Sequence, residues 1–160
     1  MQGFGIFVVI GVAVFLYYFF KALSDGPPPD ARPRSIPSGR EPPRIKGNGR
    51  YSVEAVGESF YKPALHAIFG VSEEDGGEEK HLDGVLVLED DNPHDKNAVA
   101  VTLMGKKVAH LSREVAADFR KAIARDGLSQ WKEFAVGVEV WVSDDPEDHY
   151  SVRVDLPETP

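Results

Sequence analysis

The stretch VLVLEDDNPHDKNAVAVTLMGKKVAHLS, residues 85–112, decides the fold of this chain. Val85 to Leu88 is an apolar run of strand length, and it stops at Glu89 to Pro93, a cluster of residues that favour turns and capping. Apolar alternation then resumes, and Gly105 divides it into two further short strands. The stretch therefore predicts three consecutive strands, joined first by a shaped acidic loop and then by a tight turn.

Alternating apolar residues predict three more strands outside this stretch, at 51–56, 136–142 and 150–156. Between the fourth and fifth strands, Ser112 is a plausible N-cap for a helix with an apolar stripe that ends near Gly127. A shorter helical segment is expected within 60–69. The charged stretch SEEDGGEEK, residues 72–80, is predicted to be a solvated loop.

Six short strands in a folded part of about 110 residues have edges that must be protected. Closure into a small barrel is the simplest way to protect them. We therefore expect a mainly β fold, a small six-stranded OB-like β-barrel with one or two helices, the longer of which caps one end.

Residues 1–23 are predicted to form a single transmembrane helix, because residues 3–20 are apolar and uncharged. At about 1.5 Å per residue this segment reaches roughly 27 Å, close to the hydrocarbon thickness of a bilayer. A cleaved signal peptide is the alternative, but no positive region precedes the apolar run and no A-x-A site follows it. The cationic residues that follow the segment predict a single-pass membrane protein whose folded part lies in the cytoplasm.

Residues 24–50 contain seven prolines and several basic residues, which indicates an extended linker. The basic side chains could contact anionic lipid headgroups or serve only as a topological signal. In contrast, residues 51–160 hold eleven Lys or Arg against twenty-three Asp or Glu, a net charge of −12. Such a domain repels a polyanion at long range, so any nucleic-acid binding must be local or specific for an end.

Catalytic chemistry is not expected from the motifs present. The chain has no cysteine, which excludes disulfides and Cys-type zinc sites, and it has no Walker loop and no G-x-S-x-G motif. Asp90, Asp91, His94 and Asp95 lack the spacing of known divalent-metal loops. We therefore expect no enzyme activity, no metal and no cofactor.

Three blocks of sequence together resemble the HIRAN domain: GESFY at 57–61, NPHDKNAVAV at 92–101, and HLSRE at 110–114, which opens the predicted helix. The resemblance covers about residues 51–156. HIRAN domains occur at the N-terminus of fork-remodelling ATPases, where they form an OB-like barrel that captures the 3′-hydroxyl end of single-stranded DNA, and as stand-alone bacterial proteins. No helicase motif follows here, so the resemblance implies the binding module alone.

The resemblance also implies roles for individual residues. Phe60 would stack on a terminal base, and His94 would stand where DNA-binding members have a second stacking tyrosine. Asp95 would accept the terminal 3′-hydroxyl. The implied nucleic-acid-binding set is Ser59, Phe60, Tyr61, His94, Asp95, His110 and Arg113, in which the last two approach the phosphate next to the end and Ser59 replaces a phosphate-binding arginine.

Several of these residues, and the asparagines beside them, also have a structural interpretation. Asn92, Asp95 and Asn97 could be side-chain acceptors that fix a tight loop, with Pro93 setting its backbone. Phe60 could belong to the core. His110 could be a half-buried histidine with a satisfied ring, and Arg113 a solvated side chain.

Three classes of function remain open from the sequence. The first is a membrane-tethered module that binds the 3′ end of a single-stranded nucleic acid. The second is a protein-interaction domain at the membrane, in which the acidic surface and Trp141 meet a basic partner. A structural membrane component is a third possibility.

Overall fold

A computed structural model of the chain describes residues 41–145 and 150–157. The predicted transmembrane segment and most of the predicted linker lie outside these residues. Neither of the two α-helices in the described part has the length and apolar content that crossing a bilayer requires.

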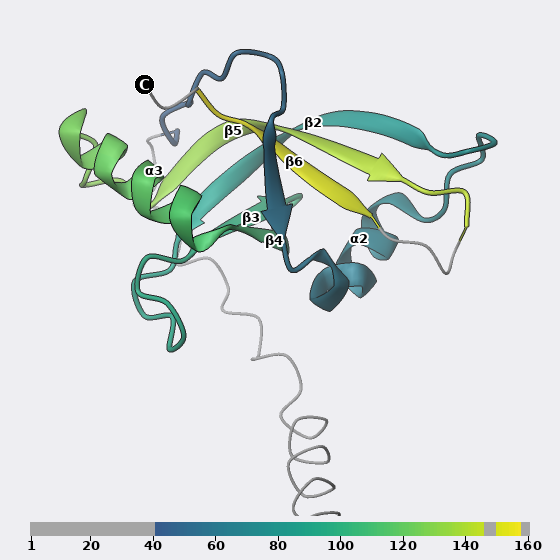
Figure 1. The fold of residues 1–160 in the computed structure, drawn as a ribbon, viewed down its shortest axis with the longest axis horizontal. Helices are drawn as coiled ribbons and strands as arrows, with labels where there is room; N and C mark the ends of the chain where they lie inside the picture. Colours follow the sequence, from purple (N-terminus) through teal and green to yellow (C-terminus); the bar gives the residue numbers. More distant parts are fainter. Residues whose placement is uncertain (1–40, 146–149, 158–160) are drawn as a thin grey trace, which may run out of the picture. The chain divides into compact units, whose positions relative to one another are not determined.

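The described chain forms a closed six-stranded antiparallel barrel with strand order β1-β4-β3-β2-β5-β6 (Figure 1). This confirms the prediction of a mainly β, six-stranded barrel with two helices. Along the chain the elements are β1 (Val53–Val56), the 3-10 turn η1 (Glu58–Tyr61), α2 (Lys62–Phe69), β2 (Glu78–Leu88), β3 (Val99–Leu103), β4 (Lys106–Leu111), α3 (Arg113–Arg125), β5 (Glu133–Val142) and β6 (Ser151–Asp155).

The longest strand, β2, corrects the prediction that residues 72–80 form a loop throughout. Residues 78–80 already pair with the end of β5, with Glu78 opposite Val142 and Lys80 opposite Val140. Glu79 faces outward there, whereas Glu78 and Lys80, on the same face as their buried partners, are half-buried and pair with each other at 2.8 Å. The chain therefore enters the sheet earlier than its apolar run indicates.

Alternation places the core as expected. In β5 every second residue from Phe134 to Val142 is buried, and the residues between them face outward. Helix α3 joins this core through Ala116, Phe119 and Ile123, and the rings of Phe119 and Phe134 meet edge to face at 5.4 Å. The predicted N-cap is also confirmed, because the Ser112 hydroxyl accepts the Val115 N–H.

The sequence predicts that the folded domain begins at residue 51. Residues 41–50, which we call the N-terminal strap, already bond to β5. Ala135 of β5 donates its N–H to the Pro43 carbonyl at 3.0 Å, and its carbonyl accepts the Ile45 N–H at 2.8 Å. These groups of Ala135 need a partner because β6 ends at Asp155, opposite Gly137. The strap therefore belongs to the folded domain.

Candidate nucleic-acid interface

The turn η1 occupies a central position because of the strand that precedes it. β1 pairs with β4 on one side and with β6 on the other. The chain leaves β1 through Gly57, whose φ of 84° is a left-handed conformation that glycine adopts without strain. The Gly57 carbonyl then accepts the Phe60 N–H at 3.0 Å. The turn is thus fixed between the ends of two neighbouring strands.

The aromatic residues of η1 point in different directions. Phe60 is 85% exposed, which rules out the interpretation that it belongs to the core. Tyr61 is half-buried, and its ring lies 5.7 Å from the imidazole of His110 on β4, measured between ring centroids. Burial raises the pKa of the Tyr61 hydroxyl. Ser59 is exposed beside them.

Glu89, at the start of the loop 89–98, connects this turn to the loop. One carboxylate oxygen lies 3.0 Å from Nε2 of His110 and accepts an N–H of the Asn92 side chain at 2.8 Å, and the other pairs with the ammonium of Lys107. The hydrogen bond from His110, followed by those from Lys107 and Asn92, outweighs burial and lowers the pKa of Glu89 to about 2. The interpretation of His110 as a half-buried histidine with a satisfied ring is confirmed.

The loop itself is shaped by its own polar side chains. Oδ1 of Asn92 accepts the N–H groups of His94 at 2.9 Å and Asp95 at 3.2 Å. Oδ1 of Asp95 accepts the N–H of Asn97 at 2.8 Å. The structural interpretation is therefore confirmed for Asn92 and, for one oxygen, for Asp95. Asn97 takes part through its backbone.

Arg120 of α3 clamps the far side of the loop. Its guanidinium donates to the carbonyls of Asn97 at 2.9 Å and Ala98 at 3.0 Å, and to the carboxylate of Asp90 at 2.8 Å. Asp90 also pairs with Lys132, and its hydrogen bonds to Lys132 and Arg120 lower its pKa. The loop is therefore held by side-chain contacts at both of its ends.

Arg113 is exposed at the first position of α3, and it makes no ion pair with any residue that the structure describes. His94 is also exposed, at the tip of the loop. The interpretation of Arg113 as a solvated side chain therefore agrees with its exposure, and the same exposure leaves it accessible to an anion.

A chain of side-chain contacts connects most of the predicted site residues into one region. Tyr61 contacts His110, His110 contacts Glu89, and Glu89 contacts Asn92, whose amide oxygen holds the backbone of His94 and Asp95. Ser59 and Phe60 belong to the same turn as Tyr61. Arg113 follows β4 and the Ser112 cap, and no contact connects it with the loop within the described residues.

Sequence reasoning missed the residues that hold this region together. Glu89 was expected only as part of a turn, and Lys107 and Arg120 were not singled out. A single carboxylate between a strand and a polar loop has no characteristic spacing, and Arg120 lies off the apolar stripe of α3 as any solvated residue would. Only the fold brings these three residues to the loop.

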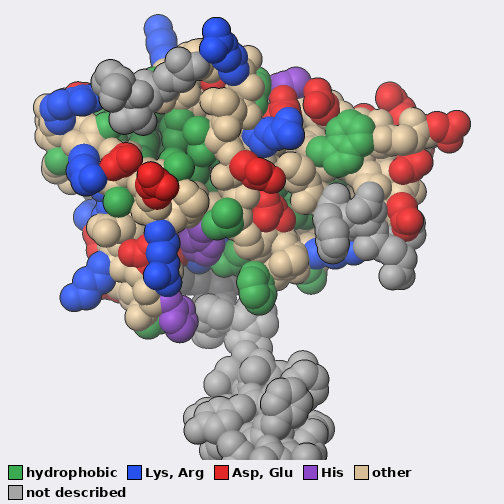
Figure 2. Space-filling view, viewed as in Figure 1, with side chains coloured by type: hydrophobic (Ala, Val, Ile, Leu, Met, Phe, Trp, Pro, Cys, Tyr) green, Lys and Arg blue, Asp and Glu red, His purple; other side chains and the backbone are tan. Residues whose placement is uncertain are grey.

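Charge is unevenly distributed on the face seen in Figure 2. Acidic side chains gather at its right-hand end, where β2 begins and β5 ends, and Lys and Arg side chains are more frequent at the other end, over α3 and the loop. The acidic residues of that end are Glu73, Glu74, Asp75, Glu78, Glu79, Asp144 and Asp145. The net negative charge of the domain is therefore not centred on the loop.

Similarity to known proteins does not identify the site. No protein-family model matches the chain, and comparisons with curated proteins and with solved structures give no match. The resemblance to HIRAN domains stays a prediction from the sequence. Among the described residues, no group of three or more His, Asp or Glu side chains is arranged to hold a metal ion.

Proposed function

We propose that this domain binds the 3′ end of a single-stranded nucleic acid, on the face formed by η1, the loop 89–98 and the start of α3. The observation that carries the proposal is the 85% exposure of Phe60 beside the Tyr61–His110 contact. The closed barrel agrees with an OB-like fold, and the motifs at 57–61, 92–101 and 110–114 that resemble HIRAN domains lie in or beside this region.

Phe60 supplies a stacking surface. An exposed phenyl ring leaves apolar area in water, so burying that area against a base is favourable. Stacking of a base on an aromatic side chain contributes about 1 to 3 kcal/mol and works for any base, because every base has a π face. His94, exposed at the tip of the loop, offers a second and smaller planar surface.

Asp95 distinguishes a 3′-hydroxyl end from a 3′-phosphate end. One of its oxygens accepts the Asn97 N–H, which fixes the orientation of the carboxylate. The other oxygen can accept a hydrogen bond from a terminal hydroxyl, whereas a terminal phosphate would be repelled by the same charge. Arg113 and His110 then provide attraction for the phosphate next to the end.

Electrostatics favours short contacts over long-range attraction. The described domain carries a net negative charge, so long-range electrostatic attraction contributes little to the binding of a nucleic acid. Local contacts must hold the bound end. End binding needs few phosphate contacts, and it is the mode that such a domain tolerates best. We place the domain at the cytoplasmic face of a membrane, tethered through residues 3–20.

A fluorescence-anisotropy titration tests the proposal. The full-length chain in a mild detergent is titrated against two labelled single strands of the same sequence, one ending in a 3′-hydroxyl and the other in a 3′-phosphate, at low and at moderate salt. We expect binding of the hydroxyl form and at least a tenfold weaker affinity for the phosphate form. Equal affinity for both ends, or no binding to either even at low salt, would refute the proposal.

A protein-interaction domain is the second candidate. Trp141 on β5 is 36% exposed at the acidic end of the barrel, and it lies close enough to Gly77 that a Cβ there would come within 2.7 Å of the indole. An exposed tryptophan among carboxylates suits a basic protein segment. Flat oligonucleotide titrations, together with recovery of a membrane protein that is lost with Trp141→Ala, would favour this function.

A further inference from the structure

The first half of strand β2 extends past its neighbour β3. β5 pairs with β2 over residues 78–87, whereas β3 pairs only with residues 85–88. The chain leaves β3 at a tight turn, where Met104 and Gly105 have left-handed φ values of 49° and 75°. No described strand therefore pairs with residues 78–84 on the side away from β5, and we call this side the free edge.

The register of β2 determines which backbone groups the free edge presents. Leu88 donates its N–H to the Lys132 carbonyl on the β5 side, and Glu89 donates its N–H to the Ala98 carbonyl on the β3 side. Alternate residues of a strand bond to opposite sides, so the even-numbered residues of β2 bond to β5. The residues whose N–H and C=O point to the free edge are then Glu79, His81 and Asp83.

Exposure shows that the free edge faces solvent. Glu79, His81 and Asp83 are all exposed. Leu82 packs on the core but is only partly buried, although its partner on β5, Val138, is fully buried. A strand added along the free edge would cover Leu82 and bond the unpaired backbone groups.

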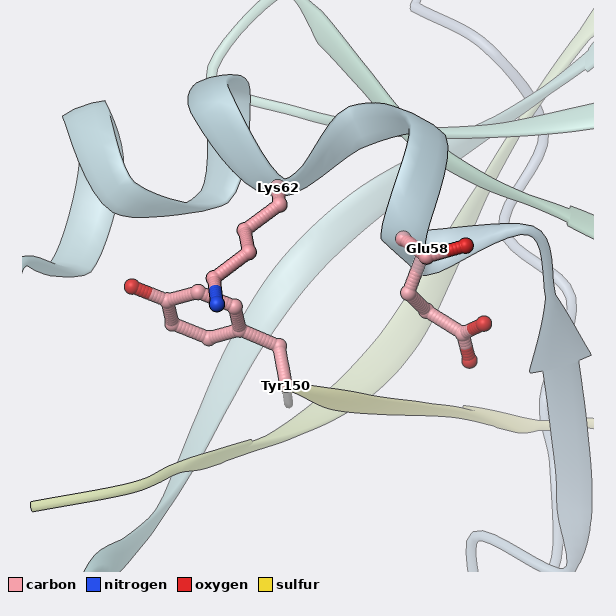
Figure 3. Close-up of a pocket in the computed structure, with 4 residues that line it drawn as sticks. Glu58, Lys62 and Tyr150 are labelled. Atoms are coloured by element: carbon pink, nitrogen blue, oxygen red, sulfur yellow. The ribbon is translucent and has the colours of Figure 1, made fainter. Parts of the chain in front are cut away.

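The segments beside the free edge are fixed elsewhere. The loop before β2 is bonded to the end of β5, because Ser72 donates its N–H to the Ser143 carbonyl at 2.9 Å. Helix α2 is fixed to the chain before β6, where the Tyr150 hydroxyl donates to the Gly70 carbonyl. Figure 3 shows Lys62 of α2 extending toward the ring of Tyr150. The free edge is therefore formed before any partner binds.

On the outward face of the free edge, Glu79 makes no ion pair with any residue that the structure describes. In contrast, Asp83 pairs with Arg44 at 2.7 Å, and Nε2 of His81 lies 3.1 Å from a carboxylate oxygen of Glu139. A Lys or Arg of an added strand can therefore pair with Glu79 without displacing another side chain.

The surroundings of Glu79 favour the same cation. Glu79 lies opposite Trp141 of β5, which is 36% exposed on the same face, and the acidic end of the barrel in Figure 2 adjoins both. A cation at this position is attracted by the carboxylates and can lie over the indole ring. A second copy of the free edge would present Glu79, His81 and Asp83 on this face, and so it would supply no Lys or Arg.

We propose that the free edge of β2 binds an extended segment of another protein by strand addition. Basic side chains of the segment face outward to Glu79 and Trp141, and apolar side chains between them cover Leu82. Main-chain hydrogen bonds hold the segment, and the alternation of basic and apolar residues selects it. The inference does not depend on end binding, because η1, the loop 89–98 and the start of α3 form that face.

Titrations of the full-length chain in mild detergent test the inference, with a labelled peptide in which arginine and valine alternate as the probe. We expect binding that weakens as salt rises, and no binding of a peptide with glutamate in place of arginine. Two further peptides carry N-methyl groups, on the arginine amides in one and on the valine amides in the other. Since alternate amides of an added strand face β2, one form should bind about tenfold more weakly and the other should bind normally.

Hydrogen exchange of single amides, measured by NMR, locates the bound peptide. In the free chain the amides of Glu79, His81 and Asp83 should exchange faster than those of Lys80 and Leu82, which bond to β5. The arginine–valine peptide should slow exchange at the first three. Binding that leaves these three amides unchanged would overturn strand addition.

Two substitutions at His81 separate the backbone from the side chain. His81→Pro removes the N–H that points to the free edge and keeps the bonds to β5, so it should weaken peptide binding about tenfold. His81→Ala removes the same side chain but keeps the N–H, and it should bind the peptide as the wild-type chain does. The N-methylated peptides make the same test without changing the protein.

A second matched pair tests the charge. Glu79→Lys should weaken binding about threefold or more, because it removes the ion pair and adds repulsion. Glu54→Lys makes the same change of charge at an exposed position of β1 and should leave binding unchanged.

The outcomes are separate from those for end binding. If the arginine–valine peptide does not bind to the wild-type chain, or if both N-methylated forms bind equally, strand addition is wrong whatever the oligonucleotide titrations show. If no oligonucleotide binds but the peptide binds and protects the amides of the free edge, end binding is wrong and this inference stands.

Discussion

Nε2 of His110 lies 3.0 Å from a carboxylate oxygen of Glu89, and this contact ties the wall of the barrel to the loop that follows β2. The same carboxylate also holds the Asn92 side chain and the ammonium of Lys107. One charged group therefore orients both the histidine that faces Tyr61 and the loop that carries Asp95. Stability and binding are coupled at this position.

The first prediction concerns pH. The pKa of Glu89 is about 2 in the folded chain, below the ordinary 4.5. A lowered folded pKa stabilises the protein above the unfolded pKa, and this contribution is lost as the pH falls from about 4.5 toward 2. A difference of this size corresponds to roughly 3 kcal/mol.

Urea unfolding followed by tryptophan fluorescence measures this effect, because both tryptophans of the chain, Trp131 and Trp141, lie in the domain. Glu89→Gln should lower the free energy of unfolding at pH 7, and the difference from wild type should shrink as the pH approaches 2. A difference that is the same at both pH values would show that the charge of Glu89 does not stabilise the fold.

The second prediction separates binding from stability at Phe60. Its ring is 85% exposed, so Phe60→Ala should change the free energy of unfolding by no more than about 0.5 kcal/mol. If the ring stacks on a base, the same change should weaken oligonucleotide binding by about 1 to 3 kcal/mol. Met104→Ala, at a side chain that is 72% exposed on the β3–β4 turn, is the control and should leave binding unchanged. Equal effects of both changes on binding would argue against stacking.

The third prediction uses two substitutions of Asp95. Asp95→Asn keeps an oxygen that can accept the Asn97 N–H, so the loop should retain its shape while the charge is lost. This variant should bind strands with a 3′-phosphate nearly as well as strands with a 3′-hydroxyl. Asp95→Ala also removes the loop acceptor, and it should weaken binding to both ends. Unchanged preference for the hydroxyl in Asp95→Asn would exclude a role for this carboxylate in recognising the end.

The fourth prediction concerns the clamp on the loop. Arg120→Lys cannot reproduce three hydrogen bonds to the carbonyls of Asn97 and Ala98 and the carboxylate of Asp90, because lysine lacks the planar fork. We expect a loss of about 1 to 3 kcal/mol in unfolding free energy. Amide hydrogen exchange in the loop 89–98 should also be faster than in the wild-type chain, whereas exchange in β3 should change less. Arg125→Lys at the exposed end of α3 is the matched control.

The fifth prediction tests the strap. A Cβ on Gly47 would come within 2.1 Å of the carboxylate carbon of Asp155, so Gly47→Ala should push the strap away from β6. Limited proteolysis should then cleave within residues 41–50 faster than in wild type. Lys46→Ala, at the exposed neighbouring position, should not change the cleavage rate. Equal rates for the two variants would mean that the contact with Asp155 does not hold the strap.

The sequence predicts the barrel well because its signals are local. Alternation in β5, the Ser112 cap and the break at Gly105 each depend on a few neighbouring residues, and the structure confirms each of them. The first residues of β2 were missed because Glu78, Glu79 and Lys80 are charged and give no apolar signal, although Glu78 and Lys80 are half-buried and pair with each other. The strap was missed because its pairing depends on where a distant strand, β6, ends.

The site was predicted less completely than the fold. The Asx contacts of Asn92 and Asp95 follow from the loop sequence, because each acceptor reaches a backbone N–H two or three residues away. The roles of Glu89, Lys107 and Arg120 depend on contacts between residues 18 to 30 positions apart. No spacing rule relates such residues before the barrel is closed.

The pairing of residues 43–45 with Ala135 determines the shortest fragment of the chain that stays monomeric in isolation. A fragment cut at Tyr51, where the apolar pattern begins, would leave the N–H and C=O of Ala135 unpaired at an open stretch of sheet. Such an opening invites the edge of another molecule to add on, and self-association follows. A fragment that starts at Glu41 would stay monomeric under conditions in which the fragment cut at Tyr51 self-associates.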